Sequence, residues 1–409
     1  MKTDVWFLFL LGFLSVACQS KTFEKESGQV ESFAEMVAAG VKPIALGSPM
    51  RSAELDLFMP EAERLAQKYQ VEFIRESDFP KNLLFPNALQ EGEEVLIFYA
   101  GDELAAYQSL KSSIENSDGS LASQLKNSRR LGRLLGYPVW KINELIEQNS
   151  PFRDLEDFGI LGQELNWYYQ DLARAKAFYS QKIGLKLLVE TESSATFEIA
   201  GDSRLVLYDL SKSPYEGSEP KSVALALLTT NLDSWYAHLQ AENIPVKYPL
   251  KRNHSGPHDG FVAVDPEGYL LEFETFYQHP ENEGLIPELE KLSPQETSLG
   301  ADFSFVGSIT WLYYKDMLPA QQFMEENLGL RLSADQGWAK IYRLSSNSYI
   351  ALVDGLRGMN SFSEEKLADL KISLQDPEGW EEYLQSTSRD SSRKSGSFKD
   401  SGLYTIYFK

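Results

Sequence analysis

The sequence DPEGYLLEFETF, residues 265–276, decides how the middle of the chain folds. Its first four residues favour a tight turn, because Pro266 fixes φ and Gly268 can adopt a positive φ. Glu272 and Glu274 then alternate with apolar residues, and this period of two is typical of a strand. The stretch therefore predicts a strand entered from a tight turn, with both carboxylates on one face.

Upstream, residues 165–190, LNWYYQDLARAKAFYSQKIGLKLLVE, predict a strand, a helix capped by Asp171, and a second strand after Gly184. Two shorter strands follow. A second strand and helix, SVALALLTTNLDSWYAHLQAENIPVKY, occupy residues 222–248. The predicted order is βαβββ twice over, and the expected fold class is α+β.

Two motifs in this region resemble a known superfamily: the strand-x-D-L-x-x-A-x-x-F-Y-x-x-x-x-G-L pattern at 165–185 and F-x-A-V-D-P-E-G-Y-L-L-E-F at 261–273. Residues 163–277 resemble a vicinal oxygen chelate domain, the group that includes glyoxalase I, bleomycin resistance proteins and extradiol dioxygenases. The resemblance implies paired βαβββ modules around an open cleft. It does not imply one reaction, because the fold serves isomerases, lyases, oxygenases and non-catalytic binders.

Composition limits the class of partner. The 409 residues contain 43% hydrophobic side chains, enough for two or three packed domains. Lys and Arg number 39 against 60 Asp and Glu, and the net charge of −21 repels nucleic acid. We therefore expect a small-molecule ligand and no nucleic acid. No feature of the sequence indicates an oligomeric state.

The first residues predict export. Residues 5–17, VWFLFLLGFLSVA, are too short to span a bilayer and suit the apolar core of a signal peptide. They end at Cys18, the single cysteine, in a context that resembles a bacterial lipobox. The sequence predicts a lipoprotein signal peptide at 1–18, lipidation of Cys18, and a membrane-anchored protein on the periplasmic or cell-surface side. The alternative is a cleaved secretory peptide with an incidental cysteine.

The remaining chain is predicted as a tether at 19–40, a small α/β domain at 41–150, a vicinal-oxygen-chelate-like domain at 151–277, a linker at 278–302 and a second such domain at 303–409. The second domain follows from an internal repeat with a constant offset of 145, which pairs Asp171 with Asp316 and Gly184 with Gly329. At this offset the equivalent of Asp265 is position 410. We therefore expect the second domain to lack its last strand. Asp376 is expected to begin a helix.

The resemblance implies metal ligands at Glu164, Ala224 and Glu272, of which only the two glutamates can bind an ion. This set favours magnesium, manganese or calcium over iron or zinc. Strand alternation places Asn166, Tyr168 and Glu274 on the same predicted concave face, as binding residues. The alternative is that the carboxylates are simply solvated.

His258 precedes a strand in a loop that borders the cleft in this superfamily, and it is our candidate acid-base group beside Glu272. The resemblance implies a lyase or isomerase acting on a small oxygenated molecule. Two alternatives remain, a non-catalytic binder of the bleomycin-resistance type and a purely structural or partner-binding role.

Overall fold

The computed structural model describes residues 23–86, 89–253, 255–386 and 397–409. The signal peptide and Cys18 lie outside them. The chain forms two compact units. Unit 1 extends to Ser117 and includes Arg130–Tyr137, and unit 2 comprises Asp118–Arg129 and Pro138–Lys409. In the described part, no helix is both long and apolar enough to cross a membrane.

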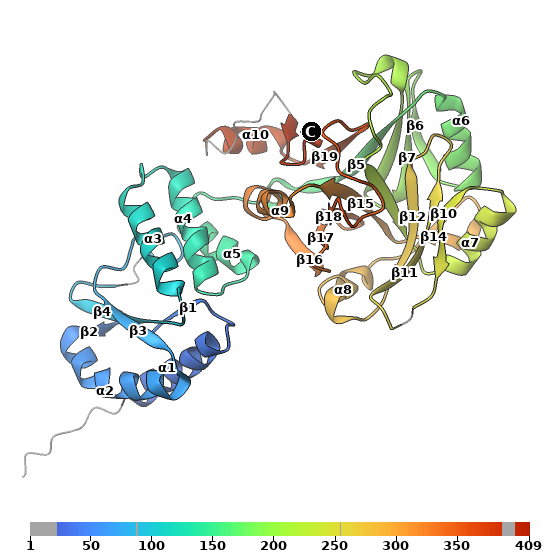
Figure 1. The fold of residues 1–409 in the computed structure, drawn as a ribbon. Helices are drawn as coiled ribbons and strands as arrows, with labels where there is room; N and C mark the ends of the chain where they lie inside the picture. The colour runs from blue at the N-terminus through green and yellow to red at the C-terminus, as the bar shows by residue number, and fades with distance from the viewer. Residues whose placement is uncertain (1–22, 87–88, 254, 387–396) are drawn as a thin grey trace, which may run out of the picture. The chain divides into compact units, whose positions relative to one another are not determined.

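Unit 1 is a small α/β body (Figure 1). Its central strand, β4, pairs antiparallel with β1, β2 and β3. The elements are α1 (Glu24–Ala38), β1 (Ile44–Leu46), β2 (Met50–Arg51), α2 (Ser52–Tyr69), β3 (Glu72–Glu76), β4 (Glu93–Tyr99) and α3 (Glu103–Glu115). The predicted tether is wrong over most of its length, because α1 is a helix that buries Val30, Ala34 and Val37 in this unit's core.

The helices α4 (Leu121–Leu134) and α5 (Val139–Asn149) follow. The predicted domain boundary at residue 150 is wrong, since α5 packs in unit 2. The side-chain amide of Asn143 donates a hydrogen bond of 3.0 Å to the backbone oxygen of Glu325 there.

Unit 2 is built from four successive modules. The first contains β5 (Ile160–Tyr169), α6 (Leu172–Ala177), β6 (Lys186–Glu190), β7 (Ser194–Ala200) and β8 (Ser203–Asp209). The second contains β9 (Val223–Leu228), α7 (Leu232–Ala241), β10 (Val246–Lys251), β11 (His258–Val264) and β12 (Leu270–Phe276). The third contains β15 (Gly307–Tyr314), α9 (Met317–Gln322), β16 (Arg331–Asp335), β17 (Ala339–Arg343) and β18 (Ser348–Asp354). The fourth is described through β19 (Ala368–Leu374), α10 (Pro377–Ser386), β20 (Ser397–Lys399) and β21 (Thr405–Phe408).

The modules do not pair as two tandem domains. The first module joins the fourth in a seven-stranded sheet, in the order β20-β21-β19-β5-β8-β7-β6. The second joins the third in an eight-stranded sheet, in the order β10-β11-β12-β9-β15-β18-β17-β16. The predicted domains 151–277 and 303–409 are therefore wrong as structural units, because each sheet takes one module from each half. The βαβββ modules themselves are confirmed.

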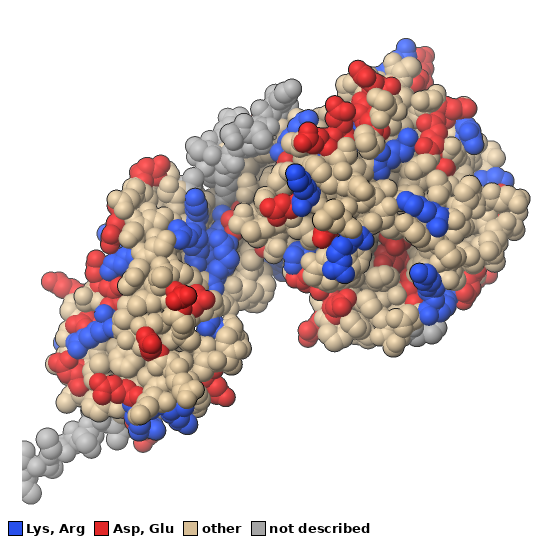
Figure 2. Space-filling view, viewed as in Figure 1, with Lys and Arg blue, Asp and Glu red and all other residues tan. Residues whose placement is uncertain are grey.

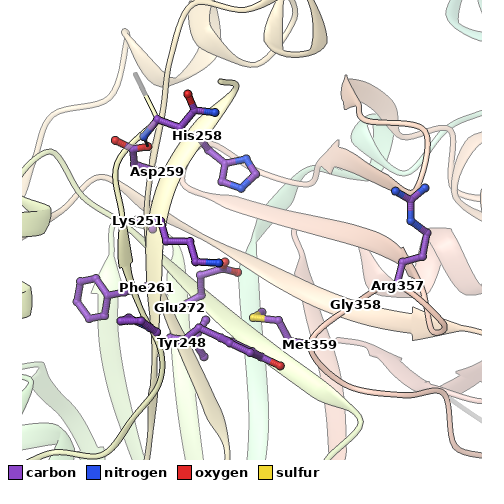
Figure 3. A pocket seen from close by; sticks show the side chains of 13 residues that line it. Tyr248, Lys251, His258, Asp259, Phe261, Glu272, Arg357, Gly358 and Met359 are labelled. Atoms are coloured by element: carbon purple, nitrogen blue, oxygen red, sulfur yellow. Dashed lines mark hydrogen bonds between the residues drawn. The ribbon is translucent and has the colours of Figure 1, made fainter. Parts of the chain in front are cut away.

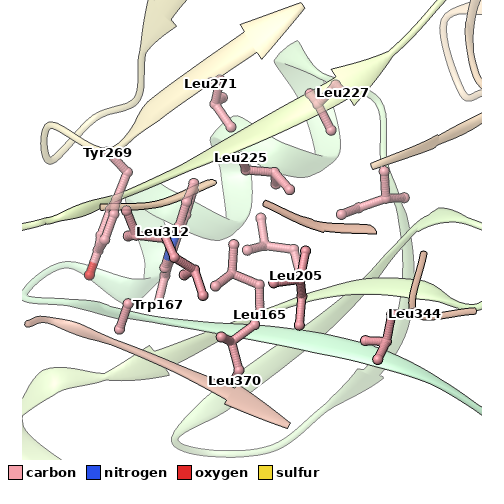
Figure 4. Packing of buried hydrophobic residues seen from close by; sticks show 14 of the residues in the cluster. Leu165, Trp167, Leu205, Leu225, Leu227, Tyr269, Leu271, Leu312, Leu344 and Leu370 are labelled. Carbon is pink, nitrogen blue, oxygen red and sulfur yellow. The ribbon is translucent and has the colours of Figure 1, made fainter. Parts of the chain in front are cut away.

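The two sheets share one hydrophobic core (Figure 4). Leu165, Trp167 and Leu370 enter it from the seven-stranded sheet. Leu225 and Leu271 enter it from the eight-stranded sheet. Since successive side chains of a strand alternate in direction, the other face of each sheet points away from the shared core.

The repeat is visible in matching details. Asp171 and Asp316 cap their helices by accepting from the backbone N–H groups of Arg174 and Leu318. Each helix continues into a π-helical turn, Phe178–Lys182 or Phe323–Asn327. The expected start of α10 is confirmed, because Gly379 donates its backbone N–H to Asp376 at 2.9 Å.

The prediction that the last strand is missing is wrong. β21 pairs parallel with β19, as β12 pairs with β9. The true partner of Asp265 is Asp400, an offset of 400 − 265 = 135, because the connection before this turn is shorter in the second half. Asp265 accepts from the backbone N–H of Tyr269 at 2.7 Å, and Asp400 accepts from that of Tyr404 at 2.8 Å.

The predicted linker 278–302 is largely structured. It contains short helical turns at Pro280–Asn282 (η4) and Ile286–Leu289 (α8), then β13 (Gln295–Thr297), and it ends inside β14 (Gly300–Phe305). Asn282 and Leu285 are fully buried. The segment therefore covers part of unit 2.

Candidate functional site

Glu164 and Glu272 do not converge. Glu164 lies on β5 in the seven-stranded sheet, and Glu272 lies on β12 in the eight-stranded sheet. The Glu164 carboxylate contacts the Lys371 ammonium at 2.8 Å and the Arg204 guanidinium at 3.6 Å. The predicted two-glutamate metal site is therefore wrong, because the interleaved modules put its two halves on outer faces of different sheets.

Asn166 and Tyr168 lie on β5 at alternating positions with Glu164, in the seven-stranded sheet. The Tyr168 hydroxyl donates to Asp369 of β19, and the Tyr215 hydroxyl donates to the same carboxyl at 2.6 Å. Burial raises the pKa of Asp369, which these two tyrosines partly oppose. Aromatic side chains thus occupy this face next to its buried carboxyl.

The eight-stranded sheet carries a different cluster, formed by Glu272 and Glu274 of β12 and His258 of β11. The two strands pair antiparallel, with His258 opposite Phe276 and Gly260 opposite Glu274. His258 Nδ1 lies 3.8 Å from Oε1 of Glu274. The structure therefore brings together three predicted site residues, His258, Glu272 and Glu274.

Two cavities that share lining residues lie at this cluster, and Figure 3 shows the outer one. The outer cavity, about 420 Å³, is bordered by Tyr248 and Lys251 of β10 and, from the segment after β18, by Arg357 and Met359. The inner pocket, about 80 Å³, lies between β12, β15 and β18. His258, Glu272, Arg357, Gly358 and Met359 line both.

Polar atoms without a partner gather in the inner pocket. Within the described residues, four buried side-chain atoms of its lining make no hydrogen bond: Glu274 Oε2, His258 Nδ1, Trp311 Nε1 and Gln336 Nε2. A buried polar group without a partner costs roughly 1–3 kcal/mol. Native proteins leave few such groups, so four around one pocket indicate a place for a polar ligand or ordered water.

Burial changes the ionisation of this cluster. It raises the pKa of Glu272 to about 7, and the Trp311 indole partly opposes the rise although its geometry falls short of a hydrogen bond. Burial raises the pKa of Glu274 well above its ordinary value, and the nearby Glu272 charge adds to the rise. Burial also lowers the pKa of His258. Near neutral pH Glu274 is therefore protonated and Glu272 partly protonated, beside a neutral imidazole.

These residues do not fit a divalent metal ion. In the part of the chain that the structure describes, no three His, Cys, Asp or Glu side chains form a group able to hold one. Ala226, opposite Glu272 on β9, and Ile309, opposite Ala226 on β15, contribute no ligand atom. Zinc normally takes at least three side-chain ligands and calcium roughly six to eight oxygens, more than this cluster supplies. The side chains of this cluster are therefore suited to transferring protons and forming hydrogen bonds.

Trp311, Gln336, Trp338 and Arg357 were not predicted as site residues. All come from the third module, which the sequence analysis assigned to a separate domain. The internal repeat could have identified Trp311 as a candidate, because it is the equivalent of Asn166 at the offset of 145. Their contribution depends on the pairing of β9 with β15, which no local pattern specifies.

Part of the chain matches a known protein family. Residues 164–273 match the Glyoxalase/Bleomycin resistance protein/Dioxygenase superfamily. No curated protein sequence matches the chain significantly.

Solved structures that match the chain include glyoxalase I from Zea mays, with 13% identity, 61% of this chain and 91% of that chain covered, and a TM-score of 0.42. Another is lactoylglutathione lyase from Agrobacterium tumefaciens, with 24% identity, coverages of 27% and 90%, and a TM-score of 0.24. A third is a glyoxalase/bleomycin resistance protein/dioxygenase from Alicyclobacillus acidocaldarius, with 25% identity, coverages of 28% and 90%, and a TM-score of 0.23.

Proposed function

We propose that the eight-stranded sheet of this glyoxalase-superfamily domain binds a small oxygenated molecule and moves a proton on it without a metal ion. The reaction would be of the lyase or isomerase type, with Glu272 as the acid-base group. The carrying observation is that Glu272 and Glu274 share one aromatic-lined pocket with unpartnered hydrogen-bonding atoms.

The ionisation of Glu272 suits this role. A general base works best when its pKa is near the working pH, because it can then both take and return a proton. Burial raises the pKa of Glu272 to about 7. Glu274 stays protonated, since burial raises its pKa further above the ordinary range. The two carboxyls thus have different roles, one as proton acceptor and one as donor.

For an α-hydroxy ketone the proton balance is complete. Glu272 takes the proton from the carbon that bears the hydroxyl, while the Glu274 carboxyl gives its proton to the carbonyl oxygen. The resulting enediol accepts the carbon proton back from Glu272 at the neighbouring carbon, and its other hydroxyl returns a proton to Glu274. Trp311 and Gln336 offer N–H donors that stabilise the negative charge developing on the carbonyl oxygen of the substrate.

The test uses hydroxyacetone in D₂O near neutral pH, followed by NMR. We expect deuterium to enter the hydroxyl-bearing carbon of hydroxyacetone faster than in buffer alone. EDTA should leave this rate unchanged. Glu272→Gln should abolish the exchange, whereas Glu164→Gln, on the other sheet, should retain it. Exchange that is equal in the parent protein and in Glu272→Gln would contradict the catalytic role.

The second candidate is a non-catalytic binder. It is favoured by Trp311 and Gln336, uncharged donors that can hold a ligand without reacting with it. This candidate predicts that ligands perturb the Trp311 fluorescence but undergo no exchange. Hydroxyacetone binding without deuterium incorporation, in parent protein and Glu272→Gln alike, would support the binder and reject the enzyme.

A further inference from the structure

Two cations face the outer cavity without an acidic partner. Lys251 and Arg357 both line it, and among the described residues neither side chain forms an ion pair. The guanidinium of Arg357 lies 5.9 Å from the centre of the Trp338 ring instead. Some other cations of unit 2 do form ion pairs, for example Lys340 with Asp335 and Lys371 with Glu164.

Lys251 and Arg357 border the same cavity of an acidic chain. Asp and Glu outnumber Lys and Arg by 60 to 39. Figure 2 shows acidic side chains spread over the visible face of unit 2, with basic ones among them. Because the two cations come from different elements and border one cavity, an anionic group of a ligand there would be attracted by two positive charges.

The sizes of the two cavities limit how the ligand lies. A cavity of about 150 Å³ accommodates benzene. The inner pocket, at about 80 Å³, is too small for a ring and has room for a hydroxyl, carbonyl or similar head. The outer cavity of about 420 Å³ holds the rest of a small molecule. Tyr248 and Met359 provide it with apolar walls.

We propose that the ligand is an organic anion with three parts: a small oxygen-bearing head in the inner pocket, an apolar body against Tyr248 and Met359, and an anionic group near Lys251 and Arg357. The proposal rests on the proposed function, because it assumes that the same site is occupied. It specifies the charge of the ligand and the direction in which the ligand binds. The proposed proton transfer at the oxygen-bearing head determines neither.

The probe is 4-(hydroxymethyl)benzoate, which has a hydroxymethyl head, a ring and a carboxylate. A molecule of this size is expected to bind with a Kd on the order of 1 mM, within the range of NMR titration. Three matched compounds isolate each part: 4-methylbenzoate lacks the polar head, benzyl alcohol lacks the anion, and 4-(hydroxymethyl)benzylamine carries a cation in its place.

We expect 4-(hydroxymethyl)benzoate to bind at least tenfold more tightly than the alcohol and the amine, and increasing salt should weaken it. The double variant Lys251→Gln/Arg357→Gln should remove the advantage of the anion and leave the alcohol unaffected. Lys212→Gln, an equal type of charge change on the first module, should alter neither. Gln336→Met should weaken the binding of 4-(hydroxymethyl)benzoate and benzyl alcohol, which carry the hydroxymethyl head, and leave that of 4-methylbenzoate unchanged.

The outcomes separate this inference from the proposed function. Tighter binding of the amine, or an anion preference that survives the double variant, would overturn the anionic ligand class while the site remained. Binding of no probe, with hydroxyacetone exchange still dependent on Glu272, would likewise reject the ligand class alone. Binding that no substitution in either cavity changes would reject the site itself.

Discussion

His258 Nδ1 and Glu274 Oε1 lie 3.8 Å apart and do not form an ion pair. Burial lowers the pKa of the histidine and raises that of the glutamate, so both are uncharged near neutral pH. A buried charge is costly, and the pair avoids that cost by neutralisation. The proton of Glu274 is thus available to a ligand.

The first prediction concerns pH and stability. The pKa of Glu272 is about 7 in the folded protein against about 4.3 in an unfolded chain, so the folded state binds its proton more tightly. This contribution is fully present below pH 4.3 and is lost as pH rises through 7. Between pH 5 and pH 8 the free energy of unfolding of the parent should therefore fall by about 2 kcal/mol more than that of Glu272→Gln. Urea denaturation at both pH values measures this. Glu192→Gln, at an exposed turn, should follow the parent, and parallel curves for all three proteins would contradict it.

The second prediction compares two glutamines. Gln336→Met removes an amide nitrogen that has no partner in the described structure, so stability should stay equal or rise by up to about 1 kcal/mol. Gln163→Met removes the donor to the Thr310 hydroxyl between the sheets, and stability should fall by about 1–2 kcal/mol. Thermal unfolding checks both. A larger loss for Gln336→Met than for Gln163→Met would show that Gln336 supports the fold rather than a ligand.

The third prediction tests the equivalence of Asp265 and Asp400. Each accepts from a tyrosine hydroxyl, Tyr169 or Tyr314, and from two backbone N–H groups of its own turn. Replacing either aspartate by Ala leaves several buried donors without an acceptor. Each variant should therefore lose about 3 kcal/mol or more of unfolding free energy. Asp376→Ala, which removes a helix cap, should cost about 1 kcal/mol. A small effect at Asp400 alone would mean that the second turn is not a structural copy of the first.

The fourth prediction concerns the two halves. The sequence alone suggested a separate second domain at 303–409 that lacks its last strand. The interleaved pairing predicts instead that a protease site inserted between Ser293 and Pro294 leaves both fragments bound, because β5 pairs with β19 and β9 with β15. Gel filtration should show one peak in buffer and two in urea. Separate folded fragments in buffer would contradict the pairing.

The fifth prediction concerns the N-terminal residues, which lie outside the described structure. We propose that Cys18 is lipidated and anchors an exported protein. Cys18→Ser should then move the protein from the membrane fraction to the soluble periplasmic fraction. An unchanged distribution, measured by fractionation and immunoblotting, would refute the anchor.

Much of the fold could be predicted because alternation and turn chemistry are local. The turn at Asp265, the caps at Asp171 and Asp316 and the modules themselves followed from neighbouring residues. The pairing of modules did not, because a strand's pattern specifies its buried face and not its neighbour along the sheet edge. The site depended on that pairing. Glu272, Glu274 and His258 were predicted from one module and lie together in the structure, whereas Glu164 lies on the other sheet and Trp311 was not predicted.

The interleaving also sets an order of events during synthesis. Glu164 and its partner Lys371 are separated by 207 residues, so β5 leaves the ribosome long before β19 exists to pair with it. Until then its edge is open to misplaced strands, and such long-range pairing slows folding. The second and third modules, adjacent in the chain, can close their sheet first. The cavity-bearing half of unit 2 would then form the surface on which the last-made strands assemble.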